Sequence, residues 1–511
     1  MSQKGGVIVI GSGFGGAVCA SRLAEAGITV TLIERGPWRD TVPVRSMGIA
    51  SRAPFPRGRS ALLRLMRAVR NDKIPGGGVS LSKKGLFELH LSKGLNVLCS
   101  SGVGGGSHVY AGLNAPPPDP DYWNGIVDGL SAEEMQKSYD RVFERMGARP
   151  AMADDQLPTT LEERFGDSEV VDAAGADYEV PVGYLFPATP GKPQKITNDD
   201  GVERYEMTPG EEGNLGSEKG GKTSLDFAYI ARAMKHGLRV LDLCEVTAVR
   251  RCADDRGRYL VDLINHHTGK RETHRTENVI LAAGTLNTLR LLLHSRDIGG
   301  LADMPRLGQQ FGGNADFFGY WHLDDKQRDL SVGMPGRGLL RMKEAEPLGE
   351  GREWPLIGEG SLPTPRTLPL GGWISRKLRR GTYVAAMGAD AQDGSVRYRA
   401  GKLSIDYEPE NSEIFSRIKA AFQLIGEKTG RRIYHLRRPT TVHPTGGACI
   451  GGDAAAGVVD ANGEVFNNPG LYVADAAALP KPIGGPPAIS IGAWADHLAE
   501  RFIERHATDR A

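Results

Sequence analysis

The sequence predicts a large α/β protein of two domains, and three observations support this fold class. The chain has 511 residues, enough to bury more than one hydrophobic core. Apolar runs typical of buried parallel strands stand near both ends of the chain, at 7–10 and 470–475, and each precedes a helical segment. The long stretches between them, rich in Gly and Pro, interrupt this alternation. One domain is therefore expected to be assembled from separate parts of the chain.

The stretch 6–36 carries the most specific pattern. A strand at 7–10, a helix at about 15–26 and a second strand at 29–33 are expected. The pattern G-x-G-x-x-G lies between the first strand and the helix and is formed by Gly11, Gly13 and Gly16. Such glycines allow a tight turn, close approach of the backbone to a pyrophosphate, and close packing of helix and strand. Glu34 ends the second strand, where a carboxylate accepts hydrogen bonds from a ribose. This order predicts a Rossmann-like unit that binds an ADP-bearing dinucleotide, FAD or NAD.

The composition argues against several other classes of function. The net charge is +1, so no overall field attracts nucleic acid. No apolar run approaches the length of a membrane-spanning helix, and the first strand begins too early for a signal peptide. The five cysteines are scattered without metal-ligand spacing, which predicts reduced thiols, no metal site and a cytoplasmic location. If an export signal had been cleaved from a precursor, the predicted cytoplasmic location would be wrong.

The segment 41–73 is unusually basic, with eight Lys or Arg residues and Asp72 as its one acidic residue. Apolar residues recur at helical spacing within 60–71, which predicts a short amphipathic helix. Two interpretations stay open. The helix could pack on the body with its cationic face in solvent, or it could form a lid over the active site that contacts a membrane surface or an acidic partner.

A second glycine cluster, at 100–108, suits a backbone that lies against a planar or phosphorylated group. Residues 131–146 are expected to form a helix, with Ser131 as N-cap and Glu134 completing a capping box. Residues 150–220 show little periodicity and are interpreted as an irregular excursion.

The second half of the chain is expected to return to the nucleotide-binding sheet. The predicted elements are a helix at 221–235, strands at 239–243 and 246–250, an antiparallel hairpin of 258–265 and 271–276, a buried strand at 278–284, a helix at 287–294, a helix at 414–428, a strand at 470–475 ending in Asp475, and a helix at 488–505 preceded by Pro487 as its first residue. Residues 311–434 mix strand-like runs with loops and are the best candidate for a layer that covers the substrate.

Together these motifs resemble the glucose–methanol–choline (GMC) family of FAD oxidoreductases, and within it most closely the bacterial cholesterol oxidases. The motifs that carry the resemblance are GSGFGG with Glu34, GVGGGS at 102–107, GKTSLDFAYIA at 221–231, LAAGTLNTLRLLLHS at 281–295, HPTGGACIGG at 443–452 and GLYVADAAALP at 470–480. They run in family order over nearly the whole chain, with 41–90 and 150–215 the weakest parts. The resemblance implies FAD rather than NAD. His108 stands one residue short of the histidine that some relatives link to FAD, so non-covalent binding is expected.

The resemblance also implies a domain organisation and a set of FAD-binding residues. A discontinuous Rossmann-like FAD domain would comprise 1–40, 90–147, 216–310 and 436–511, and a sheet-containing substrate domain or lid would comprise 41–89, 148–215 and 311–435. The residues expected to bind FAD are Gly11, Gly13, Phe14, Gly15, Gly16, Glu34, Arg35, Gly102, Gly104, Gly105, Gly106, Ser107, Val246, Ala283, Gly284, Asp475, Pro486, Pro487 and Ala488.

His443 matches the active-site histidine of the family. It would remove the hydroxyl proton, or polarise the oxygen, of an alcohol whose hydride passes to flavin N5. Glu359 matches a carboxylate that cholesterol oxidases use in double-bond isomerisation, although a structural glutamate is an equal alternative. Pro486 stands where the family has Asn or His, and proline offers no donor. Tyr110 and Asn114 are candidates to replace that donor.

The leading hypothesis is an FAD-dependent oxidase or dehydrogenase that acts on a hydroxyl of a bulky, largely apolar small molecule, such as a sterol or another secondary metabolite. Dioxygen is one candidate electron acceptor. Pro486 leaves a second hypothesis open, a flavoenzyme with non-alcohol chemistry such as desaturation, isomerisation or a redox-neutral rearrangement. A third is a flavin- or carrier-binding module recruited through 41–73.

Overall fold

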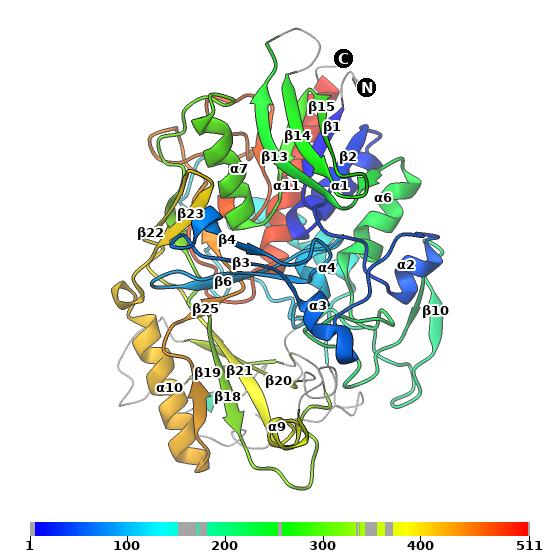
Figure 1. Cartoon of the computed structure of the whole chain (residues 1–511), viewed down its shortest axis with the longest axis vertical. Coiled ribbons are helices and arrows are strands. Elements are labelled where there is room, and N and C mark those ends of the chain that lie inside the picture. Colours follow the sequence, from blue (N-terminus) through cyan, green and yellow to red (C-terminus); the bar gives the residue numbers. More distant parts are fainter. Residues whose placement is uncertain are drawn as a thin grey trace.

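A five-stranded parallel sheet forms the centre of one half of the protein in this computed structural model (Figure 1). Its strand order is β12–β2–β1–β16–β27, and every neighbouring pair is parallel. The strands are β1 (Val7–Ile10), β2 (Val30–Ile33), β12 (Arg239–Leu241), β16 (Asn278–Leu281) and β27 (Leu471–Val473). They come from both ends and the middle of the chain, which confirms the predicted Rossmann-like α/β fold. The structure describes residues 6–151, 171–172, 181–253, 258–333, 336, 338–342, 355–362 and 371–508.

Helices and a small antiparallel sheet flank the parallel sheet. Helix α1 (Phe14–Glu25) packs against α11 (Ala488–Thr508), which in turn packs against α4 (Ala132–Met146). The three-stranded sheet β13–β14–β15 (Cys244–Arg251, Tyr259–Asn265, Lys270–Thr276) contacts α7 (Thr285–Asp297). Its last two strands form the predicted hairpin. Ser131 caps α4 by accepting a hydrogen bond from the Glu134 backbone N–H, as predicted. The Glu134 carboxylate, however, accepts a hydrogen bond from the Ser131 hydroxyl rather than from its backbone N–H.

A six-stranded antiparallel sheet forms the other half, at the end of the molecule away from the two termini (Figure 1). Its strands, in spatial order, are β24 (Ile433–His435), β18 (Phe317–His322), β21 (Gly381–Met387), β20 (Leu356–Gly360), β19 (Gly338–Met342) and β8 (Val171–Asp172). Helix α10 (Ile414–Thr429) covers one face, where the rings of Phe415 and Phe422 pack on Phe317. The predicted helix at 414–428 corresponds to α10, and the predicted strand-like runs within 311–434 correspond to strands of this sheet. That this layer covers a substrate stays a prediction.

Two further sheets lie between these halves. One has the order β25–β6–β5–β3–β4 (Thr440–Thr441, Asn96–Ser100, Phe87–His90, Met66–Arg70, Gly78–Ser80), and the other has the order β23–β22–β17–β26 (Lys402–Asp406, Gly394–Arg399, Gln309–Gly312, Thr445–Gly446). The short strands β25 and β26 belong to different sheets and stand on either side of His443. The main hydrophobic core continues from β1 and α11 to Phe317 and α10. The histidine segment therefore joins the two sheets that lie between the halves.

The prediction of a helix over 60–71 is wrong in its second half. Helix ends with α3 (Ala61–Leu65), and 66–70 forms β3, where Ala68 is fully buried. Pairing with β5 and β4 overrides the helical spacing of the apolar residues, because strand formation depends on cross-strand packing more than on local pattern. Five of the basic residues form ion pairs within the protein: Arg45 and Arg52 with Asp40, Arg57 with Glu218, Arg67 with Glu245, and Arg70 with Glu88.

The remaining elements refine other expectations. The helix predicted at 221–235 begins with a π-helical turn at Asp226–Ile230 and continues as α6 (Ala231–Lys235). Other short elements include α2 (Val42–Ser46), α9 (Gly372–Leu378), the hairpin β10–β11 (Lys195–Thr197, Glu203–Tyr205) and the pair β7–β9 (Arg149–Pro150, Pro181–Val182). Much of the expected irregular excursion at 150–220 lies outside the described residues. Within the described ranges, no helix combines the length and the apolar composition needed to cross a bilayer.

Candidate functional site

A cavity of about 550 Å³ extends from the parallel sheet to the six-stranded sheet. At one end it is lined by residues that directly follow the parallel strands: Gly11–Gly15 after β1, Glu34 and Arg35 after β2, Ala282–Thr285 after β16, and Asp475 after β27. The carboxyl ends of parallel strands are where α/β folds bind nucleotides. This end of the cavity therefore lies where a dinucleotide is expected.

The first glycine turn leaves room for a ligand at one position and packs tightly at two others. Gly11 has a φ of +99°, and a Cβ there would lie 2.2 Å from the carbonyl oxygen of Ala282. A Cβ on Gly16 would lie 1.8 Å from the carbonyl oxygen of Gly11. A Cβ on Gly13, by contrast, would have no atom of the described residues within 4 Å. The open face of Gly13 fits close approach of a pyrophosphate, and Gly16 allows α1 to pack on the turn.

Glu34 is a buried polar group that lines the cavity directly after β2. Its carboxylate is 6% exposed and accepts hydrogen bonds from the Ser12 backbone (3.1 Å), the Ser12 hydroxyl (2.8 Å) and the Gly36 backbone (2.8 Å). Arg35 and Val246 line the cavity beside it, and Arg35 is paired with Glu88 at 2.6 Å. The remaining acceptor capacity of Glu34 fits the hydroxyls of a ribose.

The second glycine cluster lies directly against the first. A Cβ on Gly105 would lie 2.5 Å from the Cα of Gly13, so the two turns touch through their backbones. Gly105 and Gly106 line the cavity. Four predicted cofactor-binding residues do not line it and instead shape the turns: Gly16, Gly102, Gly104 and Ser107. Ser107, for example, donates to the Gly104 carbonyl at 2.6 Å and accepts from the Leu225 backbone at 3.0 Å.

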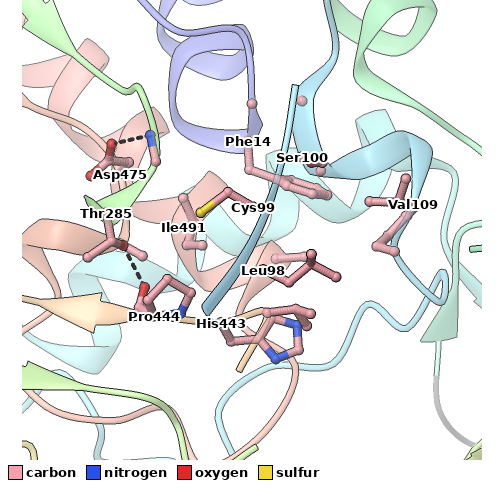
Figure 2. Close-up of a pocket in the computed structure, with 18 of the residues that line it drawn as sticks. Phe14, Leu98, Cys99, Ser100, Val109, Thr285, His443, Pro444, Asp475 and Ile491 are labelled. Atoms are coloured by element: carbon pink, nitrogen blue, oxygen red, sulfur yellow. Dashed lines mark hydrogen bonds between the residues drawn. The ribbon is translucent and has the colours of Figure 1, made fainter. Parts of the chain in front are cut away.

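Asp475 and the start of α11 close the middle of the cavity. The Asp475 carboxylate accepts hydrogen bonds from Gly284 N (2.9 Å), the Thr288 hydroxyl (2.6 Å) and Ala477 N (3.0 Å). Figure 2 draws Asp475 with its hydrogen bond to a backbone nitrogen. Burial raises the pKa of this carboxyl to about 6. Ala283, Pro486, Pro487 and Ala488 also line the cavity. Pro487 precedes the helix rather than beginning it, because α11 begins at Ala488. The first turn of α11 offers its free N–H groups and its positive end to this region.

His443 lines the far part of the cavity, where Figure 2 shows its ring near Leu98. Its Nδ1 atom lies 3.0 Å from both carboxylate oxygens of Asp316, whose side chain is 1% exposed. Asp316 also accepts hydrogen bonds from the Thr441 hydroxyl (2.8 Å) and Val442 N (2.9 Å). Nε2 of His443 forms no hydrogen bond with any residue that the structure describes. Sequence reasoning missed Asp316, because it stands 127 positions earlier in the chain and belongs to no recognisable motif.

The six-stranded sheet gives the chamber beside His443 a largely apolar wall. Phe318, Tyr383, Ala385 and Met387 face it from β18 and β21, and Leu113 also lines the cavity. Glu359 also lines the chamber and is 6% exposed. Burial raises the pKa of Tyr383 to about 12, so its hydroxyl stays protonated at neutral pH.

Tyr110 and Asn114, the candidates to replace the hydrogen-bond donor missing at Pro486, occupy different positions relative to the cavity. Tyr110 lines the cavity, but its hydroxyl donates to the Thr223 carbonyl at 2.9 Å, and burial raises its pKa. Asn114 is fully buried and does not line the cavity. His108 also lies outside the lining, with its Nε2 atom 2.6 Å from the Val103 carbonyl.

Comparisons with known proteins agree with this geometry. The family "GMC oxidoreductase" matches residues 409–495, and "NAD(P)-binding Rossmann-like domain" matches residues 9–37. A cholesterol oxidase of Mycobacterium tuberculosis is 27% identical over a 566-residue alignment that covers 99% of this chain and 92% of that protein. A cholesterol oxidase of Acinetobacter baumannii is 24% identical, with 98% and 95% covered.

Among solved structures, pyridoxine 4-oxidase from Mesorbium loti superposes with a TM-score of 0.59 at 18% sequence identity. The superposition covers 98% of this chain and 99% of that one. At this level of identity the likeness concerns the fold.

Proposed function

Because the chain is an FAD-dependent oxidoreductase of the GMC family, we propose that it oxidises a hydroxyl group of a largely apolar small molecule, with His443 accepting the hydroxyl proton. The observation that carries this proposal is the position of His443. Its imidazole lines an apolar chamber continuous with the dinucleotide site, and its Nδ1 atom is bound to a buried carboxylate. FAD, when bound, supplies the acceptor for a hydride from the substrate carbon.

The protein residues divide the remaining work. Gly11, Gly13 and Glu34 would hold the ADP part, and Gly105, Gly106 and Asp475 would lie along the middle of the cofactor. The N–H groups at the start of α11 favour negative charge nearby, as reduction of a flavin requires. His443 removes the hydroxyl proton as hydride leaves the same carbinol group, and imidazole suits this role because its pKa is normally near neutral.

The chamber supports a bulky, apolar substrate, such as a sterol or another hydrophobic alcohol. Phe318, Tyr383 and Met387 offer flat or flexible apolar surface and few polar partners. The names of the two cholesterol oxidases point to the same class of substrate. Glu359 is a candidate for moving a proton after the oxidation, and dioxygen is a candidate to reoxidise the cofactor.

Pro486 favours a second candidate function. It lines the cavity and brings no donor for an alcohol oxygen. A flavoenzyme that desaturates, isomerises or rearranges its substrate without oxidising an alcohol would not need that donor. The third candidate, recruitment through the basic segment 41–73, has less support, because five of its eight basic residues already pair with carboxylates of this chain.

The test is anaerobic mixing of the FAD-loaded protein with a panel of alcohols, including cholesterol in detergent and smaller aryl carbinols. We expect the oxidised flavin spectrum to bleach with at least one of them.

The variant His443→Ala tests the histidine. It should still bind FAD, but the rate of flavin reduction by the alcohol should fall by a factor of about 10² to 10⁴. His236→Ala, at an exposed histidine away from the cavity, is the matched control. Normal reduction in His443→Ala would refute the role of His443, and failure of every alcohol to bleach the wild type would favour the second candidate.

A further inference from the structure

We propose that Asp316 is a positioning residue that holds His443 in the tautomer with the proton on Nδ1, so that Nε2 is the basic nitrogen toward the substrate. The catalytic consequence of this inference rests on the proposed function. The tautomer itself does not, because it is a property of the protein in the absence of substrate.

The hydrogen-bonding capacity of the Asp316 carboxylate determines the tautomer. An ionised carboxylate accepts hydrogen bonds and donates none, so the nitrogen 3.0 Å away must carry a hydrogen. The carboxylate cannot rotate away, because the Thr441 hydroxyl and Val442 N both donate to it. The Thr441 hydroxyl also accepts from the backbone N–H of His443 at 2.8 Å. The ring and its partner are thus fixed to the same short segment.

The turn that carries Asp316 is also bound to the turn that carries Pro486. The Asn314 amide donates to the Gly485 carbonyl at 2.9 Å, and its oxygen accepts from Gly484 N at 2.8 Å. Asn314 and Ala315 have φ values of 54° and 45°, in the left-handed region that costs a non-glycine residue about 1 kcal/mol or more. Such conformations persist where the surroundings enforce them. One strained turn therefore sets the position of the histidine relative to the proline that replaces the usual donor.

Substituting Asp316 by Asn tests the proposal with little change in shape. The single amide oxygen is needed by Thr441 and Val442, so the amide NH₂ would face His443. An amide NH₂ group donates hydrogen bonds, so Nδ1 would have to accept one and the imidazole proton would lie on Nε2. Nε2 could then no longer accept a proton from the substrate. We expect Asp316→Asn to bind FAD normally and to slow flavin reduction about 10²- to 10⁴-fold, as for tautomer reversal in other histidine–carboxylate pairs, with little change in the substrate concentration for half-maximal rate.

The measurement that separates positioning from general damage is ¹⁵N NMR of the histidine rings, with His443 assigned from the loss of its signals in His443→Gln. In the resting wild type we expect a protonated Nδ1 and an unprotonated Nε2, and the reverse in Asp316→Asn. Asp390→Asn is the matched control. Asp390 is a buried carboxylate that accepts from Gly313 N at the same turn (2.7 Å) and from the Tyr407 hydroxyl (2.6 Å), without contacting His443.

Each outcome decides the proposal. Reversed ring signals with slowed reduction in Asp316→Asn, and neither change in Asp390→Asn, support it. A wild-type ring with its proton on Nε2 overturns it, even if Asp316→Asn does not fold, and so does an Asp316→Asn protein that reduces its flavin at the wild-type rate. Because the ring signals need no substrate, they stay decisive if alcohol oxidation itself proves wrong.

Discussion

Gly13 and Gly16 belong to the same turn but meet different surroundings. A methyl group on Gly16 would lie 1.8 Å from a backbone carbonyl, whereas a methyl group on Gly13 would enter open space beside the cavity. Gly13 has a φ of −72°, which alanine also adopts. We therefore expect the fold of the protein without ligand to require glycine at position 16, and ligand binding to require it at position 13.

This difference predicts opposite effects of two equal substitutions. Gly13→Ala should leave the thermal unfolding of the apoprotein nearly unchanged and weaken FAD binding about ten-fold or more, because the methyl group takes the space of the ligand. Gly16→Ala should lower the stability of the apoprotein by about 1 to 3 kcal/mol, since backbone must move to admit the methyl group. Unfolding of both apoproteins and titration with FAD would check this. Equal losses of stability in the two variants would contradict it.

The residues of the site differ in how far the sequence could predict them. Gly13, Glu34 and His443 stand in short motifs whose chemistry is local, and the structure places all three on one cavity. Asp316 could not be found in this way, because a carboxylate next to a distant histidine leaves no mark in the sequence. The sequence also did not predict that Gly105 lines the cavity whereas Gly104 only shapes the turn. That difference depends on how distant segments pack against each other.

At the scale of secondary-structure elements, Lys222 joins its own segment to the segments that carry His108–Tyr110 and Gly213. It is fully buried, and its ammonium donates to the carbonyls of His108 (2.9 Å), Tyr110 (2.9 Å) and Gly213 (2.8 Å). Burial lowers the pKa of this lysine to about 7. The segment from Gly105 to Tyr110, four of whose residues line the cavity, is thereby tied to the loop at 212–222.

Lys222→Met should lower the free energy of unfolding by about 3 kcal/mol or more, because it leaves buried carbonyls without a donor. It should also weaken FAD binding, since the glycine segment loses its support. Lys219→Met is the matched control, because Lys219 is half exposed and its pair with Glu211 is a surface contact worth about 1 kcal/mol or less. Chemical denaturation of both variants measures the difference. Losses of the same size in both would show that the buried lysine does not hold these segments.

Elements fixed by local pattern were predicted well, and those fixed by distant pairing were not. The βαβ unit at 6–36 and helices α4 and α10 follow from their own periodicity and caps. Strand β3 does not, because its apolar residues have helical spacing and it becomes a strand only between β5 and β4. The six-stranded sheet combines strands from 171 to 435, an order that local patterns do not contain.

At the scale of the whole molecule, the residues of β21 that line the cavity all lie on one face of the six-stranded sheet. Along β21 the side chains alternate, so that Tyr383, Ala385 and Met387 line the chamber. Ala386 pairs with Phe317, whose ring packs on α10, and is fully buried on the other face. The chamber and the main core are thus separated by the thickness of one sheet, and the neighbouring residues Ala385 and Ala386 face opposite sides of it.

This arrangement predicts that Ala385→Phe changes what the enzyme accepts, and that Ala386→Phe changes how stable it is. The larger ring at 385 would occupy the chamber beside Phe318, so reduction of the flavin by a sterol should slow about ten-fold or more while a small aryl carbinol still reacts and FAD stays bound. At 386 the ring would overpack the core against α10 and should cost about 1 to 3 kcal/mol without altering the preference between the two alcohols. Anaerobic reduction rates with both alcohols, together with unfolding curves, separate these effects. Equal slowing of both alcohols in Ala385→Phe would mean that this wall does not select the substrate, and a changed preference in Ala386→Phe would mean that the sheet does not separate the core from the chamber.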